Sequence, residues 1–262
     1  MAMEGCVIQR SAEALDPHLA VVRAPAEIEA RRRVVRAGIM ERSPYVCSPQ
    51  FVRIGSGDLA IAFEGYDAHF FDGSLRSVLG ERPLGFRLST RASRRAGSLR
   101  ISSRREPDGT RTESFEMTVS TTLLFESFRD GERLATAAGQ ECTDRLDAFQ
   151  RVVEHEIVHL VEHLRFGDTN CSGARYQGIA GAVFGHRAHR HELVTPRERA
   201  GRLGFELGQR VAFEFDGVRH QGILSRVTKR ATVLVPHPQG ELLSDGNRYQ
   251  RFYVPLRRLT QA

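Results

Sequence analysis

Three residues near the middle of the chain have the types and the spacing to hold a metal ion and use it. His155 and His159 are four residues apart, and Glu156 follows the first directly. On an α-helix the two histidines project from one face, one turn apart, where both imidazoles can reach zinc at ~2.0–2.1 Å. Glu156 lies one position round the helix and can take a proton from water that zinc has made more acidic. The pattern predicts a zinc site with its own general base.

A catalytic zinc also needs a third protein ligand, and the sequence leaves several candidates open. His163 continues the spacing of four, but three ligands on one straight helix close poorly round a tetrahedral ion. Glu162 could serve as a carboxylate ligand, although a solvated side chain is the simpler expectation. The downstream candidates are Cys171, His186, His189 and His191.

The helix that would carry the metal ligands is predicted from its own pattern. Its apolar residues recur every three or four positions: Leu146, Phe149, Val153, Ile157, Leu160 and Leu164. Thr143 or Asp144 can cap its start and Gly167 can end it. The histidines leave this apolar stripe undisturbed, so the helix can pack against a core and still present them.

The elements around this helix are predicted to form an α+β core. Helical spacing or capping residues predict helices over 26–42, from Ser56 or Asp58 to just before Gly73, over 174–184 and over 195–201. Strand-like runs occupy 85–90, 97–103 and 114–125, with a turn at 106–110. Connections this short favour a small antiparallel meander covered on one side by helices.

After Gly204 the chain is β-patterned, with turn signals at 216–217, 238–240 and 244–247. Four or five short strands in this length predict a small all-β barrel of the SH3-like kind. The predicted division is a partly helical N-terminal segment (1–52), a core carrying the metal site (53–203) and the barrel (204–262).

Two stretches, FEMTVSTTLLFESF and CTDRLDAFQRVVEHEIVHLVEHL, resemble the core of SprT-like zinc metalloproteases, the family that includes Spartan, which degrades proteins crosslinked to DNA. YDAHFFDGSL (66–75) is similar to an upstream helix of that family, and the likeness spans roughly 56–190. The resemblance implies a zincin-like fold, in which a small sheet accompanies the long zinc helix, and peptide hydrolysis with Zn²⁺ as cofactor.

The resemblance also bears on the third ligand. SprT-like members usually have a His-Gly-x-x-Phe motif whose histidine binds zinc, and here Cys171 stands where that histidine is expected. Tyr176 approximates the aromatic residue of the motif. A thiolate binds zinc at ~2.3 Å. The alternative is that Cys171 is only a buried helix-start cysteine, and His186 or His191 is the ligand.

Two further residues are candidate stabilisers of a tetrahedral oxyanion. Tyr176 and Arg175 could supply the hydrogen bonds that this role needs, although both also suit ordinary packing or surface positions.

The charge of the chain allows a nucleic-acid partner. The formal net charge is +6, and Lys229 is the single lysine, so nearly all the positive charge is arginine, which suits phosphate contacts. In the C-terminal module, basic residues alternate with aromatic ones, and the candidate contacts to DNA or RNA are Arg226, Lys229 and Arg230. The alternative is that the aromatics fill the barrel and the charges are its solvated face.

The remaining composition favours a cytoplasmic protein without a membrane span. No run approaches the ~18–20 apolar residues of a membrane helix, and residues 1–20 lack the pattern of a signal peptide. The four cysteines, Cys6, Cys47, Cys142 and Cys171, form no paired framework and are expected to be reduced.

These observations predict a zinc metallopeptidase that acts on a protein substrate, with the C-terminal barrel recruiting the target. One alternative is a non-catalytic, zinc-stabilised protein that binds nucleic acid or another protein; its metal would be closed by four protein ligands rather than three. A weaker one is a metallohydrolase with a non-peptide substrate. Neither the cleavage preference nor the oligomeric state follows from the sequence.

Overall fold

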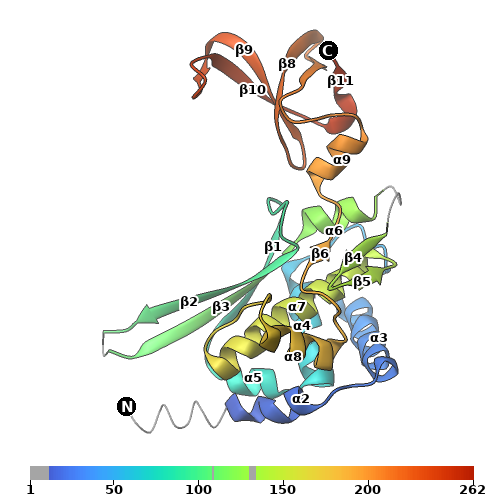
Figure 1. Cartoon of the computed structure of the whole chain (residues 1–262), viewed down its shortest axis with the longest axis vertical. Helices are drawn as coiled ribbons and strands as arrows, with labels where there is room; N and C mark the ends of the chain where they lie inside the picture. Colours follow the sequence, from blue (N-terminus) through green and yellow to red (C-terminus); the bar gives the residue numbers. More distant parts are fainter. Residues whose placement is uncertain (1–11, 108, 130–133) are drawn as a thin grey trace.

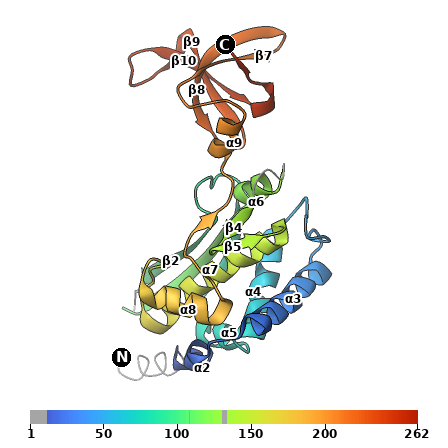
Figure 2. The same cartoon turned by 45° about the vertical axis from the view of Figure 1, so that its right-hand side comes forward.

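The computed structural model of the chain describes residues 12–107, 109–129 and 134–262. It confirms a mixed α+β protein (Figure 1). Most helices gather around one long central helix, and the last five strands form a separate small sheet at the other end of the molecule (Figures 1 and 2). Cys6 and the start of the N-terminal segment lie outside the described residues.

The central helix, α7 (Arg145–Phe166), begins and ends where the sequence predicts. The Asp144 carboxylate caps it by accepting a hydrogen bond from the backbone N–H of Asp147, and Gly167 ends it in the left-handed region at φ 81°. Its apolar stripe is fully buried apart from Leu164 at the end of the helix, which is 8% exposed. The histidine-bearing segment is therefore clamped on its core side.

Four more predicted helices are present, one of them with a short companion. The helix predicted to run from Ser56 or Asp58 to just before Gly73 ends at Phe70. A separate short helix that was not predicted begins after Gly73, which has a φ of 80°. The bounds of the helices are α2 Asp16–Ala20, α3 Pro25–Arg42, α4 Ser56–Phe70, α5 Ser74–Leu79, α8 Ala174–Phe184 and α9 Pro196–Arg202.

The first sheet is not the antiparallel meander expected from the sequence. Its strands are β1 (Leu84–Ser89), β2 (Gly97–Arg105) and β3 (Arg111–Ser120), in the order β1-β3-β2. β2 and β3 form an antiparallel hairpin that projects from the body of the molecule (Figure 1), but β1 pairs with β3 in parallel. β3 carries the buried side chains of the sheet and takes the central position, with a partner on each side.

The predicted strand over 114–125 is also too long. Residues Thr121–Ser127 form a helix, α6, and the Ser120 hydroxyl caps it by accepting a hydrogen bond from the Leu123 N–H. Ser120 also donates to the Ala92 carbonyl. A side-chain cap at the end of the strand therefore outweighs the β-propensity of the following threonines.

Three very short strands form a second sheet that the sequence did not indicate. β4 (Ala135–Ala137) pairs with β5 (Gln140–Cys142) and, on its other side, with β6 (His191–Glu192). Strands of two or three residues carry no usable periodicity. This small sheet matters because it brings the segment after α8 back across α7.

The C-terminal module is an antiparallel sheet of five strands, as many as predicted. The DG turn is confirmed, because Asp216 and Gly217 both have positive φ, at 52° and 75°. The predicted turn at 238–240 is wrong, since these residues continue a long strand with a register shift opposite Arg248 and Tyr249. The strands are β7 Arg210–Phe215, β8 Val218–Val227, β9 Ala231–Leu242, β10 Arg248–Val254 and β11 Thr260–Gln261.

This module is not a closed barrel. Its strand order is β10-β9-β8-β7-β11, and within residues 204–262, all of which are described, the two outer strands form no ladder with each other.

Two separate hydrophobic cores correspond to the two ends of the molecule. The first joins α3, α4, α7, α8 and the first sheet, and the second lies within the C-terminal sheet and includes Ala200 of α9. Between them, Arg199 of α9 forms an ion pair with Glu126 of α6 at 2.6 Å. In the described parts of the chain, no helix has the length and apolar character to cross a membrane.

Candidate metal centre

The structure brings three of the predicted donors together. His155 and His159 extend from adjacent turns of α7, and Cys171 lies in the turn that precedes α8. One ligand atom from each lies within 4.8 Å of the others. The Nε2 atoms of the two histidines face each other at 3.2 Å. One ion of zinc size could contact all three residues, whose soft and borderline donors suit zinc.

The protonation states of the histidines fit such an ion. Burial lowers the pKa of His155 far below its usual value, and neighbouring His191 and His159 lower it further. Burial also lowers the pKa of His159, against an opposing effect of Glu162. Both rings are therefore neutral near pH 7, which metal binding requires. His159 Nδ1 is 2.6 Å from the Thr169 hydroxyl, a contact that orients its Nε2 towards His155.

The turn that carries Cys171 is held by a buried carboxylate from α7. Glu162 accepts hydrogen bonds from the Asn170 backbone N–H at 2.9 Å and from Arg175 Nε at 2.8 Å. With the contact between Thr169 and His159, these hydrogen bonds tie the chain on both sides of Cys171 to α7. Glu162 is thus engaged with the protein, and it positions a candidate ligand instead of offering a ligand itself.

Glu156 is buried beside the edge of the first sheet. Its carboxylate accepts a hydrogen bond from the Leu99 backbone N–H, and a Cβ on Gly97 would collide with its Oε1 and lie 2.8 Å from Val152 Cγ1. Its Oε2 is buried and has no hydrogen-bond partner in the described part of the chain. Burial raises the pKa of Glu156 to about 8, against the opposing effect of the Leu99 hydrogen bond. A carboxyl with a pKa near neutral can both take up and release a proton.

The other histidines lie outside the three-donor group. His186 Nε2 contacts the buried Glu154 carboxylate at 2.9 Å. His163 contacts Glu113 at 3.2 Å and packs against the ring of Phe115. His189 is half-buried and close enough to His155 for its charge to lower the His155 pKa. His191 is close to the group, with its ring centre 4.6 Å from that of His155, but Nδ1 accepts a backbone hydrogen bond.

The two predicted oxyanion stabilisers are engaged elsewhere. The Tyr176 hydroxyl donates to the His155 backbone carbonyl at 2.9 Å, and its ring packs on both histidine rings at 5.2 and 4.7 Å. Arg175 is paired with Glu162 and with Asp168. Tyr176 therefore packs against the two candidate histidine ligands of α7, and Arg175 holds the turn before α8.

A buried network behind the helix was not predicted from the sequence. Glu154 is fully buried, and its carboxylate accepts hydrogen bonds from Arg32 Nε at 2.6 Å, from Arg32 Nη2 at 2.9 Å and from the Tyr66 hydroxyl at 2.7 Å. Burial would raise its pKa, but the Arg32 charge and hydrogen bonds from His186 and Arg32 outweigh this effect and lower the pKa. Glu154 directly precedes the first candidate ligand, so the network fixes the rotation of α7.

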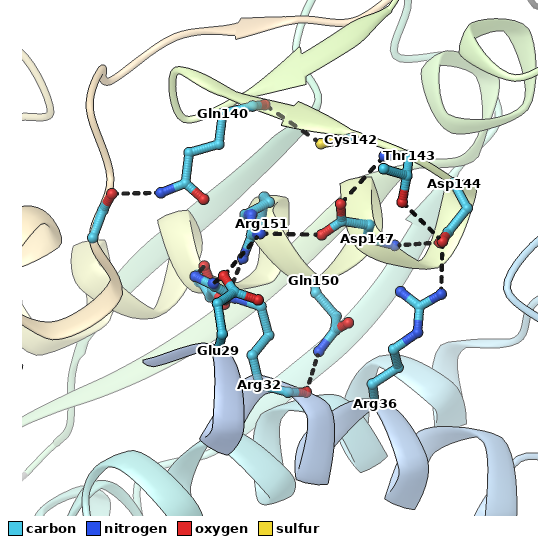
Figure 3. A network of polar contacts seen from close by, with 12 residues as sticks. Glu29, Arg32, Arg36, Gln140, Cys142, Thr143, Asp144, Asp147, Gln150 and Arg151 are labelled. Carbon is cyan, nitrogen blue, oxygen red and sulfur yellow. Dashed lines mark hydrogen bonds and ion pairs between the residues drawn. The ribbon is translucent and has the colours of Figure 1, made fainter. Parts of the chain in front are cut away.

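Figure 3 shows how this network continues along the helix. Gln150 Nε2 donates to the Arg32 backbone carbonyl at 3.1 Å, and Arg36 pairs with Asp144 at 2.7 Å. Arg151 lies between Asp147 and Glu29, at 3.3 and 3.5 Å. These contacts join α3 to α7 along the first half of α7. The one sequence signal was the polar pair at 150 and 154, spaced by one helical turn within a buried helix.

Only part of the nucleic-acid-binding surface predicted for the C-terminal module is exposed. Arg226, Lys229 and Arg230 are exposed at the end of β8 and the following turn. Three of the interleaved aromatics, Phe213, Tyr249 and Phe252, are buried in the module. Phe215 and Tyr253 are exposed, by 51% and 61%. Filling of the interior therefore accounts for most of the aromatic residues, and two remain available at the surface.

We found no match to this chain among protein-family models, curated proteins or solved structures.

Proposed function

We propose that the protein is a zinc-dependent metallopeptidase of the SprT-like type. The observation that carries the proposal is the convergence of His155, His159 and Cys171 within 4.8 Å on the helix that also bears Glu156. Zinc bound by these residues would supply Lewis-acid chemistry, making water more acidic and polarising a carbonyl group. A zincin-like core and an SH3-like C-terminal module belong to this proposal.

Glu156 is the general base in the proposed reaction. Its carboxylate takes a proton from the attacking water while the water oxygen bonds to the peptide carbonyl carbon. When the carbon–nitrogen bond breaks, the same carboxyl returns the proton to the leaving nitrogen. Its buried Oε2, which has no hydrogen-bond partner among the described residues, is available to take this proton.

A peptide is favoured over other electrophiles by the edge of the first sheet. β2 is an edge strand in the described chain, and its residues 97–99 lie against Glu156. An extended peptide can pair with an exposed strand edge through its backbone. The general base would then lie next to the bound backbone.

The test is the zinc content of the purified protein and of Cys171→Ala, followed by a protease assay with and without DNA. One zinc per chain in the wild type, lost or weakened in the variant, supports the proposed ligands. A wild-type protein that holds no zinc after reconstitution would overturn the proposal. Zinc retained in the variant would move the third ligand away from Cys171, with His186 and His191 as the next residues to replace.

A nucleic-acid contact through the C-terminal module is a second proposal, which would bring the enzyme to DNA- or RNA-bound proteins. Tyr253 and Arg226 lie on either side of Thr232 in register, so the exposed ring and guanidinium share one face of the sheet. An aromatic ring can stack on a base while cations contact phosphates. Replacing Arg226, Lys229 and Arg230 with alanine should weaken binding of a single-stranded oligonucleotide and reduce its salt dependence. Unchanged affinity and salt dependence would contradict this contact.

A further inference from the structure

His191 lies beside the candidate metal centre but is not one of the three proposed ligands. It comes from β6, and its ring centre is 4.6 Å from that of His155. Its Nδ1 accepts a hydrogen bond of 3.2 Å from the backbone N–H of Ala138. Its Nε2 is buried and has no hydrogen-bond partner among the described residues.

The hydrogen bond from Ala138 fixes the tautomer of the ring. A neutral imidazole has one lone pair and one N–H. Because Nδ1 uses its lone pair to accept from Ala138, the proton must be on Nε2. This nitrogen is then a hydrogen-bond donor and has no lone pair for a metal ion. His191 is thereby separated in role from His155 and His159, although it is adjacent to them.

The backbone that holds His191 is itself constrained. Ala138 has a φ of 54°, in the left-handed region that an alanine occupies at a cost of roughly 1 kcal/mol. Its carbonyl accepts hydrogen bonds from the N–H groups of Arg187 and Ala188, at 2.9 and 3.2 Å. The strained residue is thus tied on one side to the loop before β6 and on the other to the His191 ring. Strain of this kind is typical of functional sites.

We propose that His191 is a catalytic residue whose Nε2–H donates a hydrogen bond to the substrate carbonyl oxygen as this atom becomes an oxyanion. The inference rests on the proposed peptidase function. As the water oxygen bonds to the carbonyl carbon and Glu156 takes the water proton, the carbonyl π electrons move onto the oxygen. The Nε2–H stabilises that charge without transferring its proton, and the electrons return when the carbon–nitrogen bond breaks. A buried donor without a protein acceptor is suited to a charge that develops only during the reaction.

The inference assigns to His191 the role that the sequence suggested for Tyr176 and Arg175. The Tyr176 hydroxyl already donates to the His155 carbonyl, and Arg175 is held by two carboxylates. In the described chain, the Nδ1 atoms of His155 and His186 are also buried without a hydrogen-bond partner, but His155 is a candidate ligand and His186 is held by Glu154. This leaves the Nε2–H of His191 as the donor beside the centre that has no other role.

The experiment compares His191→Phe with the wild type and with His69→Phe, which replaces an exposed histidine on α4, away from the donor group. The phenylalanine ring keeps the shape and loses the donor. We expect His191→Phe to keep one zinc per chain with unchanged affinity in a chelator competition, and to lose about 100-fold in kcat with little change in KM. His191→Gln, whose amide can donate, should recover part of the rate. His69→Phe should behave as the wild type.

Two readouts do not depend on turnover. Nitrogen-15 NMR of histidine-labelled protein should identify the Nε2–H tautomer of His191. A peptidyl phosphinate, which carries a tetrahedral anionic group, should bind His191→Phe at least 10-fold more weakly than the wild type. An Nδ1–H tautomer, or loss of zinc in His191→Phe, would overturn the inference.

The inference and the proposed function fail in different ways. If the wild type binds zinc and cleaves peptides but His191→Phe keeps the full kcat, the inference alone is wrong. If the wild type binds no zinc or cleaves no peptide, the proposed function fails and the inference fails with it.

Discussion

At the level of single residues, burial selects the protonation state of each titratable group. Burial lowers the pKa of His155 and keeps it neutral, which suits a ligand, and it raises the pKa of Glu156, which suits a group that exchanges a proton. Burial also raises the pKa of the Cys142 thiol to about 12, so that this cysteine is unreactive near neutral pH. The same physical effect thus separates a candidate ligand, a candidate base and a structural thiol.

The three described cysteines should respond differently to a thiol reagent. Cys47 is exposed, Cys142 is buried and Cys171 is half-buried in the donor group. In the zinc-loaded protein at pH 8, we expect iodoacetamide to modify Cys47 quickly and Cys171 slowly. Removal of zinc with a chelator should speed modification of Cys171 at least 10-fold, as followed by peptide mass spectrometry, and leave Cys47 and Cys142 unchanged. Equal rates at Cys171 with and without the chelator would argue against a thiolate ligand.

Asp147 gives a pH dependence whose sign can be stated. Burial raises its pKa from 3.8 to about 6 in the folded protein, despite the opposing hydrogen bond from Thr143. The folded state therefore favours the protonated carboxyl, and its contribution to stability is complete below pH 3.8 and is lost as the pH rises through about 6. Asp147→Asn does not titrate. Relative to this variant, the wild type should lose roughly 2–3 kcal/mol of unfolding free energy between pH 3.5 and 7, measured by urea unfolding. A pH-independent difference would contradict the assignment.

Among the structural elements, α7 carries two of the candidate metal ligands and also lies at the centre of the fold. The buried contacts of Glu154 with Arg32 and Tyr66 join it to α3 and α4, across sequence separations of 122 and 88 residues. An element fixed in this way cannot rotate, and rotation would move both candidate histidine ligands. Positioning of the site therefore depends on the far side of the helix as much as on the site itself.

Breaking this network from one side should cost more than removing a surface arginine. Arg32→Met would leave the Glu154 carboxylate buried without its main counter-charge, and we expect a loss of roughly 3–5 kcal/mol in unfolding free energy. Arg33→Met, at an exposed neighbouring position of the same helix, should change it by less than about 0.5 kcal/mol. Chemical denaturation of both variants measures the difference. If the two variants are equally stable, the network does not hold the helix.

The long elements could be predicted from the sequence because their signals are local. The apolar stripe, Asp144 and Gly167 define α7 within one continuous segment, and the DG turn at 216–217 needs only its own two residues. The parallel pairing of β1 with β3 and the three short strands of the second sheet depend on partners distant in sequence. Because no local pattern indicates these pairings, they could not be predicted from the sequence.

The candidate site shows the same limit, because only the residues related by local spacing could be predicted. His155, Glu156 and His159 follow from spacing alone, whereas the third donor remained open between Cys171 and two later histidines. The structure brings Cys171 into the donor group and engages His186 with Glu154. The hydrogen bond between Ala138 and His191 joins two residues 53 positions apart, so its consequence for the tautomer is invisible in the sequence.

In the molecule as a whole, the described residues form two separate hydrophobic cores. The first contains α7 and the donor group, and the second contains the C-terminal sheet and Ala200. Ion pairing between Arg199 and Glu126 and a hydrogen bond from the Val194 N–H to the Ser127 hydroxyl connect them.

Two separate hydrophobic cores should unfold in two steps. We expect differential scanning calorimetry to resolve two transitions, of which only the larger shifts to higher temperature when zinc is added to the metal-free protein. The smaller transition belongs to the C-terminal sheet and should not respond. A single transition that moves as a whole with zinc would contradict energetic independence of the two cores.

We propose that the donor group holds zinc and that Glu156 acts with it to hydrolyse a peptide bond. The most direct test measures zinc content and peptide cleavage in the wild type and in Glu156→Gln, which has nearly the same shape. We expect one zinc per chain in both proteins and cleavage only by the wild type. Cleavage that survives in Glu156→Gln, or a wild-type protein that binds no zinc, would contradict it.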